Sequence, residues 1–407
     1  MATTYYNIKQ LLTLEGVVKK DGRKITRDDL GIIENGYLVV SDGEVKEVGT
    51  GKYPESETNI DLKECVVMPA FVDSHTHITF SGTRVNEFEL RSEGKTYAEI
   101  AAAGGGIIST VNSTRRSTAD ELYKNTLGNI KRMNTFGTGI IEAKSGYGLD
   151  AETELKQLEA IATAKKDYPY VVPTFMGAHD TPPGGGDKDL RRKSYIDIIV
   201  KTLIPKVVEN KLAVFCDVFL DEGYYTREET EFILKEAKKF GLIPKIHADE
   251  FTNQEAAILA VELGAASADH LLYVSEKGIE ALAASDTVAT FLPGTSFNLG
   301  LPYAPTKKLI DAGACIAIAS DFNPGSSACL NLQFILAIAI SRYKISVAQA
   351  IAAACYGGAK ALMVEKEFGN LCKGASAFFQ IYNASCYSDV FYNYGENHLI
   401  KLVTPNI

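Results

Sequence analysis

From about residue 70 onward, short apolar runs of strand length alternate with longer amphipathic stretches of helical period. This alternation is typical of a parallel sheet covered by helices, and eight repeats are the number that closes a (β/α)8 TIM-type barrel. The eight apolar runs are Phe71 to His77, Thr138 to Lys144, Val171 to His179, Ala213 to Leu220, Leu242 to Glu250, Ala266 to Leu271, Val288 to Pro293 and Cys315 to Asp321.

An open, doubly wound sheet is the competing architecture for the same pattern. In such a sheet the polar ligand groups gather at one switch point of the strand order. Here polar residues end runs from the first to the eighth, as His75 and Asp321 show. Since all strand ends of a parallel barrel meet at one rim, this distribution favours the barrel.

Both ends of the chain have a β-like pattern instead. Tyr37 to Gly49 alternates apolar and polar residues about Asp42-Gly43, which is a tight-hairpin signal. Two closing helices are expected in Ala328 to Met363, and the aromatic stretch Gly369 to Leu402 is expected to pair with the N-terminal sheet. We therefore predict a discontinuous small β domain, residues 1–68 plus 366–407, and a catalytic barrel domain, residues 69–365.

Capping signals mark several helix ends. Thr118-Ala-Asp-Glu121 and Thr226-Arg-Glu-Glu229 are capping boxes, in which a hydroxyl and a carboxylate satisfy the first free amides of a helix. Further predicted N-caps are Asp150 and Asn253, and glycines predicted to follow helix ends are Gly137 and Gly241.

Composition and charge narrow the class of protein. Hydrophobic residues make up 46% and charged residues 23%, and no uninterrupted apolar run approaches the ~18 residues of a membrane helix. The net charge of -9 argues against a nucleic-acid partner, which requires clustered Lys and Arg. The polar first ten residues lack a secretory pattern, and the seven cysteines form no Cys-x-x-Cys pair. We expect a cytoplasmic enzyme with reduced thiols and a small-molecule substrate, with no membrane partner.

Histidines carry the strongest chemical signal. Of six in the chain, five end a predicted strand or stand just before its end: His75, His77, His179, His247 and His270. His75 and His77 share one face of a strand because side chains repeat every two residues, although such a pair alone is also compatible with two rim histidines and no metal. Together with His247 and the carboxylate of Asp321 they make an N3O set that suits one Zn or Fe ion and leaves room for a water.

Two further groups are candidates for proton transfer at this rim. His270 is suited to hydrogen-bond the reactive water, and its neighbour Asp269 is either part of the site or a cap. Glu250 follows His247 by three residues, close enough to carry a proton between water and a leaving nitrogen, with a loop or capping carboxylate as its alternative role. Asp249 is expected to be structural.

Loops after the strands offer candidate substrate contacts. Arg84 has the planar fork that binds a carboxylate, although a surface arginine is common in such loops. Lys144-Ser-Gly-Tyr147-Gly and Asp321-Phe-Asn323-Pro-Gly325-Ser326 are glycine-punctuated loops that present donors to a ligand or simply form turns. Gly104-Gly-Gly106 lacks the ending of a phosphate loop and is predicted to be a rim loop.

These residues resemble the amidohydrolase superfamily of metal-dependent barrels, through Val72-Asp-Ser-His75-Thr-His77, His247, His270 and Asp321. Within it the chain is similar to the imidazolonepropionase family across roughly residues 70 to 330. The strings that carry the likeness are His77-Ile-Thr-Phe-Ser-Gly-Thr-Arg84, Gly104-Gly-Gly-Ile, Glu142-Ala-Lys-Ser-Gly-Tyr147-Gly, Phe175-Met-Gly-Ala-His179, Lys245-Ile-His-Ala-Asp-Glu250 and Asp321-Phe-Asn-Pro-Gly-Ser326.

The resemblance implies hydrolysis of 4-imidazolone-5-propanoate to N-formimidoyl-L-glutamate in histidine degradation, with one Zn or Fe ion per chain. It implies a small composite β-sandwich built from both chain ends. The implied metal ligands are His75, His77, His247 and Asp321. The implied catalytic residues are Glu250 and His270, and the implied substrate contacts are Arg84, Tyr147, His179, Asn323, Gly325 and Ser326.

The C-terminal part of the chain departs from the family's sequence pattern at one place. The family pattern Gly-x-Leu-x-x-Gly-x-x-Ala-Asp-Leu is matched by Gly369, Leu371, Gly374 and Ala377, but Phe378-Phe379 replaces Asp-Leu. We therefore expect the packing of the small domain to differ locally, with the barrel site unaffected.

Three other functions stay open at this stage. A deaminase of the same superfamily would use the same His and Glu spacing and release ammonia. A binuclear ring-opening hydrolase is disfavoured, because the run Ala213 to Leu220 has no lysine to bridge two ions. A catalytically inactive barrel that only binds a partner is the alternative from another class. The sequence leaves open the choice between Zn and Fe and the oligomeric state, a homodimer included.

Overall fold

The computed structural model describes residues 2–95, 99 and 105–405, so Gly104 of the predicted rim loop lies outside the described residues. Its central element is an eight-stranded parallel sheet whose strands follow each other in sequence order. Each of the eight apolar runs holds one strand, and the (β/α)8 barrel is confirmed. The strands are β5 (Phe71–Asp73), β6 (Thr138–Lys144), β7 (Val171–Ala178), β8 (Phe215–Leu220), β9 (Ile243–Ala248), β10 (Ser267–His270), β11 (Val288–Phe291) and β12 (Ile316–Ile318).

The first and last strands close the barrel beyond their own ends. The amide of Asp321 donates to the carbonyl of His75 at 3.0 Å, and the amide of His77 donates to the carbonyl of Phe322 at 2.9 Å. Thr76 and Phe322 form an isolated parallel bridge between these two bonds. The chain segments that close the barrel are therefore the same ones that carry three of the predicted metal ligands.

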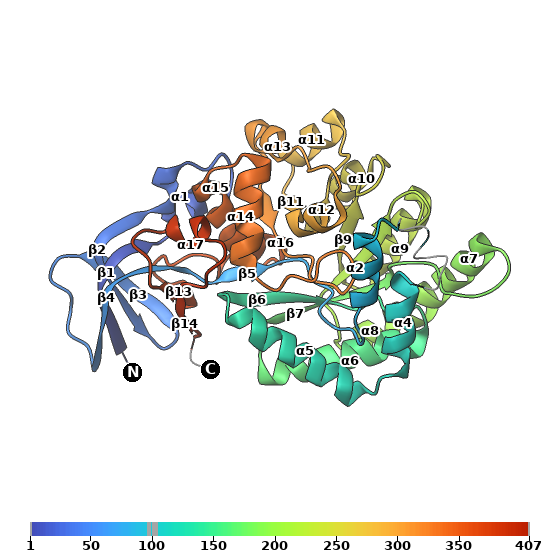
Figure 1. Cartoon of the computed structure of the whole chain (residues 1–407), viewed down its shortest axis with the longest axis horizontal. Helices are drawn as coiled ribbons and strands as arrows, with labels where there is room; N and C mark the ends of the chain where they lie inside the picture. Colours follow the sequence, from blue (N-terminus) through green and yellow to red (C-terminus); the bar gives the residue numbers. More distant parts are fainter. Residues whose placement is uncertain (1, 96–98, 100–104, 406–407) are drawn as a thin grey trace.

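Helices surround the barrel and give it its curved outer layer (Figure 1). They are α2 (Val85–Ser92), α4 (Ile107–Arg116), α5 (Ala119–Asn134), α6 (Ala151–Asp167), α7 (Lys188–Ile198), α8 (Ile204–Glu209), α9 (Arg227–Lys239), α10 (Ala256–Glu262), α11 (Glu276–Ala283), α12 (Pro293–Leu299), α13 (Thr306–Ala312), α14 (Leu332–Tyr343), α15 (Val347–Ala352) and α16 (Gly358–Ala361). Single π turns, Ile199–Leu203 and Ala353–Gly357, connect α7 to α8 and α15 to α16.

The capping predictions hold with one exception. The boxes at Thr118 and Thr226 are both formed, and the carboxylate of Asp150 accepts the amide of Thr153. Asn253 was wrongly predicted as the cap of α10, because that helix begins later, at Ala256. Its first amides donate to the carboxylate of Asp249, which reaches them from the preceding strand end and has the structural role expected of it.

Both chain ends build one small sheet, at the left of Figure 1, where the two termini also lie. Its strands are β1 (Ala2–Leu12), β2 (Ile32–Ser41), β3 (Glu44–Thr50), β4 (Thr58–Pro69), β13 (Phe379–Tyr382) and β14 (Leu399–Val403), in the order β14-β13-β4-β1-β2-β3. The β2–β3 hairpin turns at Asp42 and Gly43, which have φ of 54° and 73°. Short helical turns accompany the sheet: α1 (Glu15–Lys19), a 3-10 turn (Arg27–Leu30) and α17 (Asp389–Tyr392).

The aromatic pair in the tail packs on two different sides. Phe379 lies 5.2 Å from the ring of Tyr5, inside the apolar cluster of the small sheet. Phe378 lies 4.6 Å from the ring of Tyr170, in a separate cluster with barrel residues. The two buried rings that depart from the family pattern therefore connect the small sheet to the barrel.

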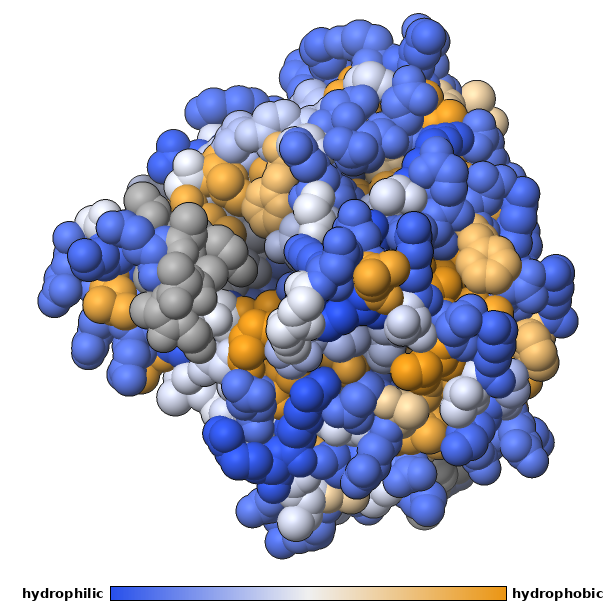
Figure 2. All heavy atoms as spheres, turned by 90° about the vertical axis from the view of Figure 1, so that its right-hand side faces the viewer, coloured by the Kyte–Doolittle hydropathy of each residue, from blue (hydrophilic) through white to orange (hydrophobic). Residues whose placement is uncertain are grey.

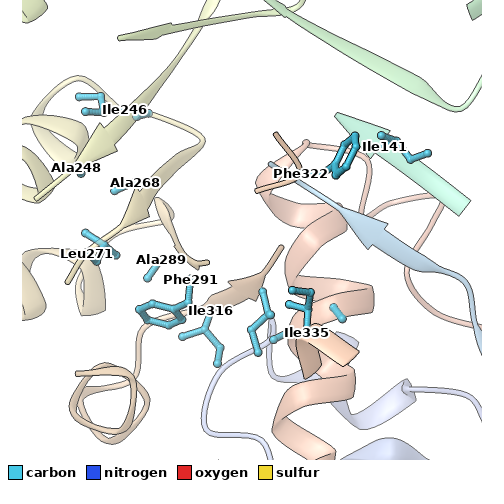
Figure 3. Close-up of a cluster of buried hydrophobic side chains, with 14 of the residues drawn as sticks. Ile141, Ile246, Ala248, Ala268, Leu271, Ala289, Phe291, Ile316, Phe322 and Ile335 are labelled. Carbon is cyan, nitrogen blue, oxygen red and sulfur yellow. The ribbon is translucent and has the colours of Figure 1, made fainter. Parts of the chain in front are cut away.

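The apolar core lies between the barrel strands and the helices. Figure 3 shows Ile246 and Ala248 of β9 on the side of the sheet where Phe291 of β11 and Ile335 of α14 also gather. The alternate side chains of the same strand, Lys245 and His247, are buried as well, on the other side. The barrel interior is thus polar and charged around Lys245 and His247, and much of the hydrophobic stabilisation comes from the outer layer.

No helix among the described residues is both long and apolar enough to cross a membrane. Figure 2 shows the face at the right of Figure 1, where hydrophilic residues predominate and apolar ones are scattered between them.

Candidate active site

Four predicted metal ligands converge inside the rim of the barrel. The Nε2 atoms of His77 and His247 lie 3.2 Å apart. Asp321 Oδ1 lies 3.6 Å from Nε2 of His75 and 3.6 Å from Nε2 of His77. All four side chains are at most 3% exposed.

These separations suit a single metal ion. Ligand atoms at ~2.1 Å from a tetrahedral ion lie about 3.4 Å from each other, close to the distances found here. His75 Nε2 has no hydrogen-bond partner among the described residues although it is buried, a costly state for a polar atom unless a ligand occupies the space in front of it. The residues present therefore fit a metal with three nitrogen ligands and one oxygen ligand.

His270 and Glu250 stand side by side next to this group. His270 Nε2 lies 3.4 Å from Glu250 Oε2, and both residues are buried. Burial and the nearby carboxylate of Asp321 raise the pKa of Glu250 well above its ordinary value, while burial and His247 lower the pKa of His270. Both shifts favour the uncharged forms of the two side chains, a protonated Glu250 and a neutral His270.

The geometry also admits His270 as a ligand, together with His75 and His247. His270 has a φ of 77° and Asp321 one of 51°, values that non-glycine residues seldom adopt. Such strained conformations cluster at sites where a side chain must be aimed at one place.

A cavity of about 920 Å³ opens over this group, and every predicted site residue except His75 lines it. Arg84 lies in its wall, where its Nε donates to Thr110 Oγ1 at 3.0 Å. The guanidinium lies flat against Gly325: a Cβ added there would stand 2.2 Å from Arg84 Nη1. Only glycine at 325 leaves room for Arg84 in this position.

His179 and Tyr147 lie on the neighbouring side of the cavity. His179 Nδ1 donates to the carbonyl of Gly146 at 2.9 Å, and its ring stacks on His77 at 4.8 Å. Burial, with a smaller contribution from His247, lowers the pKa of His179 to about 3. Since its Nδ1 carries the proton, Nε2 of this neutral ring is an acceptor.

The loop after β12 is organised by Asn323. Its side-chain oxygen accepts the amides of Gly325 and Ser326, each at 2.8 Å. Its Nδ2 donates to the carbonyl of Asp321 and to Ser326 Oγ, both at 2.7 Å. Because these bonds use its amide group fully, Asn323 shapes the cavity wall and presents Ser326 and the Gly325 backbone to it.

Two residues that sequence reasoning missed hold the loop that carries Tyr147. Glu154 of α6 is completely buried and accepts the amides of Gly146, Gly148 and Leu149 at 2.7 to 3.0 Å. Gln157, one helical turn further, accepts the amide of Tyr147 at 3.1 Å. A carboxylate on the inward stripe of an amphipathic helix was the one signal available for Glu154.

The interior of the barrel holds a second set of charged residues, whose contacts with each other sequence reasoning missed. Glu142, Lys144, Asp217, Lys245 and Asp269 are all fully buried below the histidines. Lys245 and Asp217 each precede a residue of the cavity wall by two positions, so the strand period was the signal that could have found them.

The sequence matches the amidohydrolase family over residues 66–402. An imidazolonepropionase of Clostridium tetani is 41% identical over 398 residues, which cover 96% of this chain and 94% of that protein. An imidazolonepropionase of Bacillus cytotoxicus is 41% identical over 401 residues, which cover 97% of this chain and 93% of that protein. Both relatives align with nearly the whole chain, small sheet included.

Solved structures of other proteins share the fold at low sequence identity. A triazine hydrolase variant aligns with a TM-score of 0.75 at 13% identity, covering 99% of this chain and 93% of that one. An adenosine deaminase from Xanthomonas campestris with bound zinc aligns with a TM-score of 0.69 at 14% identity, covering 99% of this chain and 91% of that one. At these identities the likeness concerns the fold alone.

Proposed function

Given that the chain belongs to the amidohydrolase family, we propose that it hydrolyses the ring of 4-imidazolone-5-propanoate to N-formimidoyl-L-glutamate, the reaction of an imidazolonepropionase. The observation that carries the proposal is the identity of 41% to imidazolonepropionases over nearly the full length of both chains. The convergence of three histidines and one aspartate below a cavity with an arginine in its wall supports it.

We propose that His75, His77, His247 and Asp321 hold one Zn or Fe ion. The distances of 3.2 to 3.6 Å between their facing atoms support this set. When bound, such an ion supplies Lewis-acid chemistry, lowering the pKa of a water molecule and polarising the ring carbonyl. Donors of both nitrogen and oxygen type suit either metal, so the choice between them depends on availability.

Glu250 is the proton carrier in this proposal. It takes a proton from the attacking water and delivers it to the ring nitrogen that leaves the carbonyl carbon, so that the water oxygen ends in the new carboxylate. Its raised pKa suits both directions of transfer. His270, 3.4 Å away and neutral, orients Glu250 and the water through its ring nitrogens.

Arg84 is the group that binds the propionate of the substrate. Its guanidinium packs against Gly325 in the loop that also holds Asn323 and Ser326, and this contact fixes its plane. A fork held in one plane can form two parallel hydrogen bonds with a carboxylate. Tyr147 and His179 stand on the neighbouring wall and contact the ring side of the substrate.

Gly325→Ala tests this placement of Arg84. The new methyl group would overlap the guanidinium, which must move, so we expect KM for the imidazolone to rise about 10-fold or more with a smaller change in kcat. Steady-state kinetics check this, with Gly395→Ala as the control, because nothing lies within 4 Å of a Cβ there. An unchanged KM would contradict the proposed role of Arg84.

Glu154→Gln tests the support of the Tyr147 loop. A glutamine offers one acceptor oxygen where Glu154 uses two, so at least one of three loop amides loses its partner. We expect kcat/KM to fall about 10-fold while metal content stays at the wild-type value. The control is Glu152→Gln on the same helix, whose side chain is exposed. A folded Glu154→Gln variant with wild-type kcat/KM would contradict the proposed role of Glu154 in supporting the loop.

The decisive experiment follows the products of purified, metal-quantified protein incubated with 4-imidazolone-5-propanoate. Formation of N-formimidoyl-L-glutamate without ammonia is the expected result. Ammonia release would favour the alternative of a deaminase of the same family. If protein with about one bound metal per chain does not turn over this compound, the substrate is another cyclic amide or amidine.

The location and assembly of the enzyme stay predictions from the sequence. We propose that it works in the cytoplasm on a free small molecule. Cell fractionation tests that location.

A further inference from the structure

A network of buried charges lies directly beneath the proposed metal ligands. Lys144 Nζ lies 2.6 Å from Asp217 Oδ2 and 2.9 Å from Glu142 Oε2. Lys245 Nζ lies 3.0 Å from Glu142 Oε1 and 3.9 Å from Asp269 Oδ2. These five residues, the barrel charge network, come from strands β6, β8, β9 and β10, and none is exposed.

The two outer carboxylates of the network reach the histidines. Asp269 Oδ2 lies 2.6 Å from Nδ1 of His75, and Asp217 Oδ2 lies 3.1 Å from Nδ1 of His247. The His75 contact is a hydrogen bond, in which the carboxylate accepts from Nδ1–H and Nε2 is left as a lone pair. The Asp217 carboxylate is in ion-pair contact with Nδ1 of His247, so Nε2 of that ring is likewise left for another partner. Those are the two Nε2 atoms that face the proposed metal position.

Two lysines keep this arrangement near electrical balance. Three carboxylates would repel each other in a space without water, and two ammonium groups placed between them offset most of that repulsion. Burial acts to lower the pKa of Lys144, but Asp217 and Glu142 outweigh it and the pKa stays above its ordinary value. Lys245 also donates to the carbonyl of Ser74, the residue before His75, at 2.9 Å.

We propose that Asp217 and Asp269 are positioning residues that fix the proton of His247 and His75 on Nδ1, and that Lys144 and Lys245 hold these carboxylates in place. The inference rests on the proposed function, because it concerns the metal of that site. It assigns the affinity for the metal in part to residues that never touch it. Groups behind metal-bound histidines commonly change metal affinity 10- to 100-fold when removed.

The test compares alanine and asparagine at each position. Asp217→Ala and Asp269→Ala remove the acceptor, and we expect their affinity for Zn, measured by competition with a chelator, to fall about 10- to 100-fold. Asp217→Asn and Asp269→Asn keep an oxygen that accepts the imidazole N–H, so we expect a clearly smaller loss. Asp29→Ala is the control, since it removes a buried, ion-paired carboxylate in the small domain and should leave metal affinity unchanged.

A folding defect is separated from a positioning effect by a charge-balanced variant. Lys144→Met combined with Asp217→Ala removes one cation and one anion that lie 2.6 Å apart, so the net charge of the network stays as in the wild type. We expect this variant to melt at a higher temperature than Asp217→Ala without regaining metal affinity. Folded alanine variants that bind Zn as tightly as wild type would overturn the inference and leave the proposed function intact. Wild-type protein that binds neither Zn nor Fe would overturn both.

Discussion

Replacing Glu250 with Gln lowers kcat by roughly 10²- to 10⁴-fold in our expectation, the range that a positioned acid or base contributes. Glutamine keeps the shape of the side chain but neither accepts nor delivers a proton. Since Glu250 is not among the proposed ligands, metal content should stay at the wild-type value. Kinetics on protein whose metal content has been measured check both statements.

The dependence of kcat/KM on pH is a second test of the proton-transfer role of Glu250. Burial and Asp321 raise the pKa of Glu250 above 4.5, so the protonated form, which cannot accept a proton from water, persists to a higher pH than for an exposed glutamate. The acidic limb of kcat/KM should therefore lie above pH 4.5 in the wild type, and the limb should be absent from any residual activity of Glu250→Gln. Glu222→Gln, an exposed carboxylate on the adjacent loop, should leave kcat and profile unchanged. Undiminished turnover in Glu250→Gln would rule out its proton-transfer role.

Removal of the metal is expected to lower turnover more than about 10³-fold, because water without a metal has a pKa near 15.7 where bound water reaches about 7. Asp321→Ala should have the same effect, since it deletes the one oxygen ligand while the Asp321 amide bond to His75 that closes the barrel is kept. Metal analysis should find much less than one ion per chain in this variant. Dialysis of wild-type protein against a chelator, followed by Zn or Fe, should abolish and then restore activity.

A surface substitution serves as the matched control for that experiment. Asp311→Ala removes an exposed aspartate that pairs only with Lys307 on its own helix, and metal content and turnover should both stay at wild-type values. Full activity in chelated, metal-free protein would disprove the metal-dependent mechanism. Wild-type metal content in Asp321→Ala would move the fourth ligand position to another residue, and His270 is the nearest candidate by geometry.

Sequence periodicity predicted the barrel because its strands are buried on both faces and so form largely apolar runs. The eight runs and the eight strands correspond one to one. The chain ends were also predictable, since the hairpin at Asp42-Gly43 and the aromatic tail both have strand patterns. The expected sandwich differs in detail, because hydrogen bonds run through all six strands of one sheet. The domain boundaries themselves stay predictions.

The candidate site was accessible from the sequence where chemistry coincides with a strand end. His75, His77, His247 and Asp321 have this property, and the structure brings them together. Their roles as ligands stay a prediction. Asn323 lines the cavity while its amide group is hydrogen-bonded within its own loop, and its contact with a substrate stays a prediction.

The residues that hold the site residues in place could not be predicted from strand ends. Lys144 and Lys245 lie inside apolar runs, where a lone lysine gives no indication of its partner. The role of Asp217 is visible only once the fold has placed it next to Lys144. Pairing across strands depends on the stagger of the barrel, which strand patterns alone do not define. Glu154 likewise acts on a loop that precedes its own helix.

The closure of the barrel by the segments that contain His75 and Asp321 has a consequence for how the protein is made. Ribosomes release the chain from its N-terminus, so His75 and His77 emerge long before the segment that pairs with them. Strand β4 precedes this first segment, and it cannot pair with its neighbour β13 until the end of the chain has been synthesised. A nascent chain therefore lacks the complete set of proposed ligands until Asp321, almost four fifths of the way along its 407 residues, has been synthesised.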